Sequence, residues 1–76
     1  MKYTKEYIKQ IIHPGAQLEG FDLSGIDLSG AQLHRSHVKG ANLSGANLLE
    51  ASLYEANMNK VNLSGANLRK AYLPYA

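Results

Sequence analysis

The chain is 76 residues long, contains no cysteine and carries a formal net charge of +2. A chain of this length forms one domain with a small core, so its stability is expected to be marginal. The lack of cysteine excludes disulfides and thiolate metal sites, and no apolar run approaches the ~20 residues of a membrane span. Because the N-terminus also lacks the apolar core of a signal peptide, we expect a cytoplasmic protein without a membrane anchor.

The positive charge belongs to the N-terminal segment. Residues 1–15 hold three lysines against one glutamate, whereas cations and anions balance over residues 16–76. A body without net charge has no field that would attract nucleic acid or another polyanion. We therefore expect no direct binding of nucleic acid, and we interpret the lysines as the solvated side of a helix.

An amphipathic helix is predicted over residues 4–13, with Thr4 as its N-cap. Apolar residues recur along it at spacings of three and four, and Pro14-Gly15 ends it. Its apolar side must cover something, and we expect it to cap one end of the structure that follows. The residues of this predicted N-terminal cap are Tyr7, Ile8, Ile11 and Ile12.

A period of five residues replaces the helical period from Ala16 onward. Twelve units follow one another over residues 16–75 without an insertion, from AQLEG and FDLSG to ANLRK and AYLPY. The first position is Ala in eight units, the second is Asn, Asp or Gln in nine, the third is Leu in ten, and the fifth is Gly in six. The sequence thus divides into a capping segment, residues 1–15, and a repeat body, residues 16–76.

The chemistry of these columns indicates a solenoid. One large and one small apolar residue, separated by one position, face the same way on a short extended segment. The next residues turn the chain, and glycine at the second turn position suits a type II turn, which needs a positive φ there. The Asn and Asp column is expected at the corners, where short polar side chains hydrogen-bond to nearby backbone.

These A(N/D)LXX units resemble the pentapeptide-repeat proteins over residues 16–75. The resemblance implies an all-β solenoid, a right-handed quadrilateral β-helix in which four pentapeptides make one square coil. Twelve units then make three coils of 20 residues, with coils stacked ~4.8 Å apart. This period explains why NLSGANL occurs at residues 42–48 and again at 62–68.

The 20-residue coil sorts the chain into four faces, numbered from Ala16. The second face has glycine at every turn, and we expect type II turns there. The fourth face has no glycine at its turns, so we expect a different turn geometry. The residues of the fourth-face turn column are Arg35, Glu55 and Tyr75.

Opposite charges also recur at the spacing of one coil. Such exposed pairs contribute little to stability, but they help to set the register of stacking. The predicted ion pairs are Glu19–Lys39, Arg35–Glu55 and Glu50–Lys70.

The fourth face is the aromatic-rich surface of the repeat body. An exposed patch of this kind can mark a protein-binding site, or the rings can simply stack between coils. Both interpretations stay open at this point, and one aliphatic residue in an outward column joins the candidates. The predicted partner surface consists of His34, Leu49, Tyr54, Tyr72 and Tyr75.

The last coil has no predicted cover, unlike the first. Either two chains dock end to end as a two-fold homodimer, or this chain is a fragment of a longer protein. The resemblance favours the first interpretation, because C-terminal dimerisation is known in the family. The predicted dimer end consists of Met58, Leu63, Leu68, Leu73 and Pro74.

No grouping of residues indicates catalysis, a cofactor or a metal. His34 and His37 belong to adjacent faces, and neither cysteines nor a carboxylate cluster accompany them. The serines recur without a base, and the glycines recur without the pattern of a phosphate-binding loop. We therefore predict a non-enzymatic protein–protein interaction module without a cofactor.

Two alternatives to this function are weighed. Some pentapeptide-repeat proteins mimic DNA and inhibit DNA gyrase, but their rods are long and acidic, whereas this body is short and neutral. The regularity of the repeats also permits a truncated or idealised scaffold that has no partner of its own.

Overall fold

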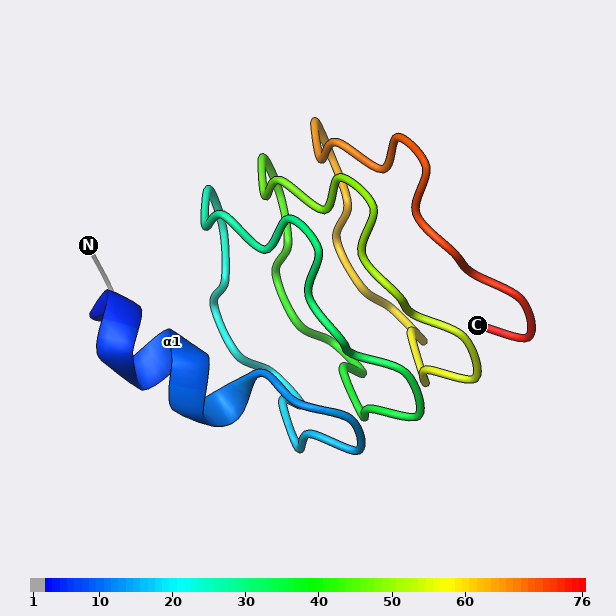
Figure 1. Ribbon diagram of the computed structural model, residues 1–76, viewed down its shortest axis with the longest axis horizontal. Coiled ribbons are helices and arrows are strands. Elements are labelled where there is room, and N and C mark those ends of the chain that lie inside the picture. The colour runs from blue at the N-terminus through cyan, green and yellow to red at the C-terminus, as the bar shows by residue number, and fades with distance from the viewer. Residues whose placement is uncertain (1–2) are drawn as a thin grey trace.

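The structure is a computed structural model and describes residues 3–76. Within that range the only helix is α1, which spans Lys5–Ile11. The rest of the chain winds into successive coils that stack along the long axis, with α1 at one end and the C-terminus at the other (Figure 1). The long axis measures 30 Å and the two others 22 Å.

Helix α1 begins where the sequence predicts and ends earlier. The side-chain oxygen of Thr4 accepts a hydrogen bond from the N–H of Tyr7 at 3.1 Å, so the predicted N-cap is confirmed. Ile12 is already extended, with φ −95° and ψ 101°. The predicted end at residue 13 is therefore wrong: Pro14 disfavours the helical region at His13, and Ile12 has already left it.

Consecutive coils are joined by parallel backbone bridges between residues 20 apart. Eight isolated bridges pair the second positions of the units, beginning with Gln17–His37 and ending with Ser52–Tyr72. The predicted period of 20 residues is thus confirmed. Within residues 3–76 no bridge extends into a longer strand, because each unit turns after a short extended stretch.

The hydrogen bonds between coils have a direction. The N–H groups of the third and fifth positions donate to the next coil, as Leu23 donates to Asn42 at 2.8 Å and Gly25 to Ser44 at 2.9 Å. In return, the second-position N–H donates to a first-position carbonyl, as Asn42 does to Phe21 at 2.9 Å. The edge of a coil that faces the C-terminus therefore offers two donors for each acceptor.

All twelve corners use the same turn. The fifth position has a φ of 69–73° at its glycines and 58–60° at its other residues. The following N–H donates to the carbonyl three residues back, as Ala46 does to Leu43 and Ala56 to Leu53, both at 3.1 Å. A positive φ confined to the second central residue defines a type II turn, so that expectation for the second face is confirmed.

The expectation of a different geometry on the fourth face is wrong. Arg35 and Glu55 have φ values of 60° and 58°, although neither is glycine. Their N–H groups donate to the carbonyls of Tyr54 and Pro74, each at 2.9 Å, so the stacking of coils holds these residues in the left-handed region. Holding a non-glycine residue there costs about 1–2 kcal/mol, and the ladder offsets this cost.

The Asn and Asp side chains brace the corners, as expected. All seven at second positions accept a hydrogen bond from the N–H two residues on, at 3.0–3.2 Å. On the third face the amides also form a ladder, in which Asn67 donates to Asn47 at 3.2 Å and Asn47 to Asp27 at 3.4 Å. Asp27 starts this ladder and needs only to accept. The fourth face has neither Asn nor Asp at this position.

The core fills the axis of the coils. The third-position residues from Leu18 to Leu53 are at most 3% exposed, and alanines of the first position pack beside them. Ser36 replaces one of these alanines and is fully buried. Its hydroxyl has no hydrogen-bond partner among residues 3–76.

Candidate interaction surfaces

The N-terminal end of the coils is covered by α1 and the residues beside it. Ile8, Ile11 and Ile12 pack against the core, and the ring of Tyr3 stacks on that of Phe21 at 5.9 Å. Tyr7 is not among the residues packed on the core; it is 40% exposed, and its ring lies 5.3 Å from that of Tyr3. No residue of α1 is fully buried, so the helix rests on the first coil rather than sinking into it.

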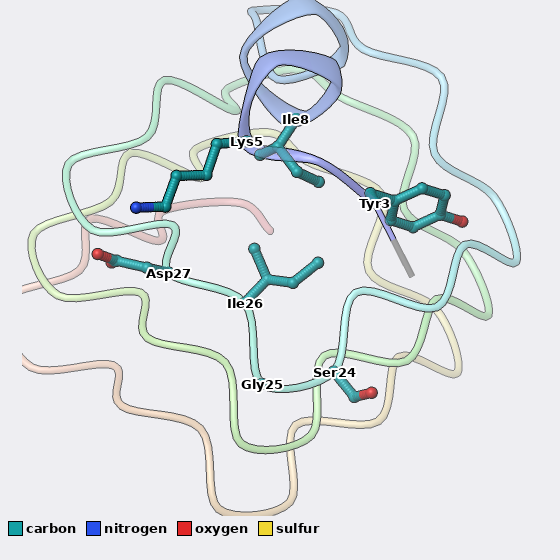
Figure 2. A pocket seen from close by; sticks show the side chains of 7 residues that line it. All are labelled: Tyr3, Lys5, Ile8, Ser24, Gly25, Ile26 and Asp27. Carbon is teal, nitrogen blue, oxygen red and sulfur yellow. The ribbon is translucent and has the colours of Figure 1, made fainter. Parts of the chain in front are cut away.

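Two hollows lie beside α1, because one helix is too narrow to fill the end of the coil. The first measures about 290 Å³; Figure 2 shows Ile8 and Ile26 pointing into it, with Lys5 and Asp27 on one side and Tyr3 on the other. A second hollow of about 330 Å³ also includes Ile8. The cap is therefore loosely packed on both sides.

Asp27, at the edge of the first hollow, has a pKa below its ordinary value. Its side chain accepts the N–H of Ser29 at 3.1 Å. This hydrogen bond is the main cause that lowers the pKa of Asp27, and the nearby charge of Lys5 acts in the same direction.

Aromatic residues of the fourth face contact one another across coils. The rings of His34 and Tyr54 stack at 4.6 Å with an angle of 2°, and Tyr54 meets the edge of Tyr72 at 5.8 Å. Arg35 lies over Tyr54 at 5.7 Å and pairs with Glu55 at 2.8 Å. That hydrogen bond raises the pKa of Arg35. The rings thus bind coils together on the one face that lacks the Asn and Asp braces.

The other predicted members of the partner surface are placed apart from this stack. Leu49 is half-buried and belongs to the third face. Tyr75 is 89% exposed at the last corner, and Tyr72 is 60% exposed beside the end of the coils. The aromatic surface that is open to a partner therefore lies at the rim of the C-terminal end.

Of the three predicted ion pairs, the structure forms one. Arg35 and Glu55 are paired, whereas Glu19–Lys39 and Glu50–Lys70 are not. All of these side chains are exposed, and the gain of an exposed pair is too small to fix two long side chains by itself. The stacking of Arg35 on Tyr54 supplies the extra contact in the pair that forms.

The C-terminal end is not covered by residues 3–76. Met58, Leu63 and Leu68 are half-buried and Leu73 is 37% exposed, although each continues a core column that is closed in the coils before it. Pro74 is half-buried beside them and accepts the N–H of Glu55. The axis of the solenoid thus opens at this end onto an apolar surface.

Backbone groups surround this apolar surface. Eight N–H groups of the last coil donate to no residue in the described range, and the four first-position carbonyls, which in the earlier coils accept from the next coil, accept from none. The donors are those of Met58, Lys60, Leu63, Gly65, Leu68, Lys70, Leu73 and Tyr75, and the acceptors those of Ala56, Val61, Ala66 and Ala71.

The last coil is also the basic part of the repeat body. Residues 56–76 carry Lys60, Arg69 and Lys70 and no Asp or Glu. The first coil, residues 16–35, has three acidic residues and one arginine. The repeat body therefore has an acidic end and a basic end, although its net charge is zero.

Residues 3–76 were compared with two structural requirements, that of a metal-ligating cluster and that of a membrane-spanning helix. Among residues 3–76, no three His, Cys, Asp or Glu side chains gather so that they could hold a metal ion. In the same range, no helix combines the length and the apolar character needed to cross a bilayer.

The coils, their period and their corner hydrogen bonds define a repeat protein whose units are five residues long. The family model described as Pentapeptide repeats (8 copies) matches residues 15–48 and 39–74. The chain therefore belongs to the pentapeptide-repeat family, as its sequence indicates. None of the curated proteins compared with the chain matches it.

Proposed function

We propose that this chain is a right-handed quadrilateral β-helix that serves as a small, rigid, non-enzymatic protein-interaction module in the cytoplasm. The observation that carries the proposal is the uncovered C-terminal end, where Leu73 is 37% exposed and backbone donors stand unpaired around the core. Burying an apolar side chain gains about 1.5–3 kcal/mol, so an end of this kind favours a partner.

The proposed occupant of this end is a second copy, docked about a two-fold axis. On each face the last coil offers one third-position N–H and one first-position carbonyl, as Leu63 and Val61 do on the second face. Two edges that run antiparallel can exchange these groups, with each N–H donating to the other copy's carbonyl. Such an interface is self-complementary, as a two-fold dimer requires.

Two features weaken this dimer. The corner N–H groups, such as those of Lys60 and Lys70, would find no carbonyl opposite them in the antiparallel arrangement. The three cations of each last coil would also face the three of the other copy. Since salt screens repulsion between exposed charges, the dimer should become tighter, not weaker, as ionic strength rises.

Sedimentation equilibrium at micromolar concentration tests this proposal. The 76-residue chain should approach twice its mass of 8.3 kDa, and Leu73→Glu should return it to the monomer. Gln17→Glu is the matched control, because it adds the same charge to an exposed residue of the first coil. A wild-type chain that stays monomeric from low to high salt would contradict the dimer.

A partner other than a second copy is proposed to use the aromatic rim at the same end. Among residues 3–76, Tyr72 and Tyr75 are the most exposed of the large apolar residues, and interfaces are enriched in tyrosine. Capture from the native host with the wild-type chain, beside a Tyr54→Ala/Tyr72→Ala variant, tests this use. Retention of every captured protein by the variant would remove the fourth face from the proposal.

A further inference from the structure

We propose that the C-terminal edge of one chain fits the first coil of another, head to tail, and that α1 prevents this open-ended assembly. The occupant is thus a second copy in a different arrangement from the two-fold dimer. The inference rests on the proposed use of the C-terminal end as a docking surface. In this proposal, α1 determines whether the chains form a closed dimer or a filament.

The hydrogen-bonding groups of the two ends are complementary. Between coils, third- and fifth-position N–H groups donate to second- and fourth-position carbonyls, and these N–H groups are unpaired in the last coil. In the first coil, the matching carbonyls of the first and third faces accept from no residue in the described range. These carbonyls are those of Gln17, Glu19, Asp27 and Ser29.

A head-to-tail contact would therefore repeat, on the first and third faces, the contact that already joins one coil to the next. On the first and third faces, the corner N–H groups of Lys60 and Lys70, which the two-fold arrangement leaves without acceptors, would meet the carbonyls of Glu19 and Ser29. One mismatch arises on the third face, where Asp27 cannot donate to Asn67 as Asn67 donates to Asn47. The backbone hydrogen bonds of the contact are more numerous than this one lost side-chain hydrogen bond.

The charges of the two ends are complementary as well. The last coil presents Lys60, Arg69 and Lys70, and the first coil has acidic residues that include Glu19 and Asp27. In the register of the repeat, Lys60 would stack next to Glu19, and Arg69 near Asp27. Opposite charges thus favour the head-to-tail contact, whereas like charges oppose the two-fold contact.

Helix α1 stands in the way, and it is held weakly. It crosses the end of the first coil at the place that another copy would occupy (Figure 1). None of its residues is fully buried, and hollows of about 290 and 330 Å³ flank Ile8. Segments with few buried contacts open most readily, so the first coil can become exposed without loss of the whole fold.

Head-to-tail contacts between identical units produce filaments when the rotation between units does not close a ring, and units stacked along the solenoid axis do not close. Capping segments with a polar outer face are the general means by which solenoids avoid this outcome. The polar side of α1 carries Lys5, Glu6 and Lys9, all exposed.

The test places a charge under the helix in the full chain. Ile8→Glu should detach α1 from the first coil. The weight-average mass of this variant in sedimentation should then exceed that of two chains and grow with concentration. Gln10→Glu is the matched control, because it adds the same charge to an exposed position of α1 and should behave as wild type. An Ile8→Glu variant that melts cooperatively yet never exceeds the dimer would overturn the proposal.

A charge reversal at the other end separates this assembly from the dimer. The variant Lys60→Glu/Lys70→Glu should not add backbone strain, since Glu50 and Glu55 already occupy the fifth position of their units at φ 58–60°. In the Ile8→Glu background it should abolish growth beyond the dimer, because both ends become acidic. In the wild-type background it should tighten the dimer at least tenfold, because repulsion is removed. Growth unaffected by the reversal would contradict the head-to-tail arrangement.

Unfolding of Ile8→Glu is controlled by a second variant, Glu6→Gly/Lys9→Gly, which weakens the helix at exposed positions and leaves its apolar contacts in place. It should also form assemblies above the dimer, and circular dichroism would report whether the coils persist. If both variants unfold, α1 is needed for folding and the proposal fails. A wild-type chain that is monomeric would refute the two-fold dimer but not the head-to-tail assembly. The assembly is tested by a different measurement, the growth in mass of the two cap variants.

Discussion

The two ends of the solenoid are built from the same repeat, but one is covered by α1 and the other by no residue in the described range. Leu33 is 1% exposed in the first coil, whereas Leu73, in the same column of the last coil, is 37% exposed. Backbone donors are also left unpaired at the C-terminal end. The difference teaches that a repeat fixes the interior of such a protein, while the non-repetitive residues at its ends decide how it associates.

The largest expected effect on stability is the difference between a core substitution in the middle coil and one in the last coil. Leu48→Ala removes a fully buried side chain and should lower the free energy of unfolding by about 2–5 kcal/mol. Leu73→Ala should cost a monomer much less, because that side chain is already partly in water. Urea denaturation of both variants, made dimer-free by dilution, measures the difference. Equal losses would mean that the last coil is as well buried as the middle one.

The capped end should show an intermediate effect. Ile8→Ala removes a half-buried side chain from the contact between α1 and the first coil, and it should cost about 1–2 kcal/mol. The exposed neighbour Tyr7 provides the comparison, since Tyr7→Ala should cost less than half as much. Thermal melts at matched concentration measure both, and the reverse order would contradict the placement of α1.

Between the two ends, substitution of one buried residue should increase the stability of the fold. Ser36 occupies an alanine position, and its fully buried hydroxyl has no partner among residues 3–76. Because an unpaired buried hydroxyl costs about 1–3 kcal/mol, Ser36→Ala should stabilise the fold by roughly 1 kcal/mol. A rise in the melting temperature checks this, and a fall would indicate that the hydroxyl is hydrogen-bonded.

Corner residues should respond in opposite directions at paired sites. Glu50 has a φ of 60° in an exposed corner, so Glu50→Gly should relieve strain and gain up to about 1 kcal/mol, reduced by the greater freedom of glycine when unfolded. Gly45→Ala, at φ 69°, should lose about 1 kcal/mol. Denaturation curves of both variants measure the contrast, and the same sign at both sites would refute the strain argument.

The smallest effect should be a pH dependence at the capped end. The pKa of Asp27 is lower in the folded chain than its ordinary value, so the unfolded chain binds protons more readily in acid. Its contribution is present above the unfolded pKa and is lost as pH falls through the folded pKa. Between about pH 5 and pH 2, wild type should therefore lose more stability than Asp27→Asn. Parallel slopes would contradict this role.

The period of the repeat predicts the 20-residue register and the corner bonds because each position is specified many times over. Departures from the repeat were harder to interpret. The lack of glycine at Arg35 and Glu55 predicts corners that differ from the glycine corners, yet the ladder imposes one turn on both. A local preference worth 1–2 kcal/mol yields to a set of hydrogen bonds that spans neighbouring coils.

The candidate surfaces were only partly predictable for a similar reason. His34, Tyr54 and Tyr72 share one face and do meet, because the period places them in adjacent coils. Leu49 lies on another face, and nothing in its own identity indicates a partner. The unequal numbers of donors and acceptors at the open end could not be derived from residue types, because they belong to the backbone.

Amide hydrogen exchange of the last coil, compared between dilute and concentrated protein, tests the central claim most directly. If the C-terminal edge docks a second copy about a two-fold axis, the N–H groups of Met58, Leu63, Leu68 and Leu73 should gain protection with concentration. The corner N–H groups of Lys60, Gly65 and Lys70 should continue to exchange rapidly, because that arrangement offers them no acceptor. Protection that is independent of concentration at all of these groups would contradict the account.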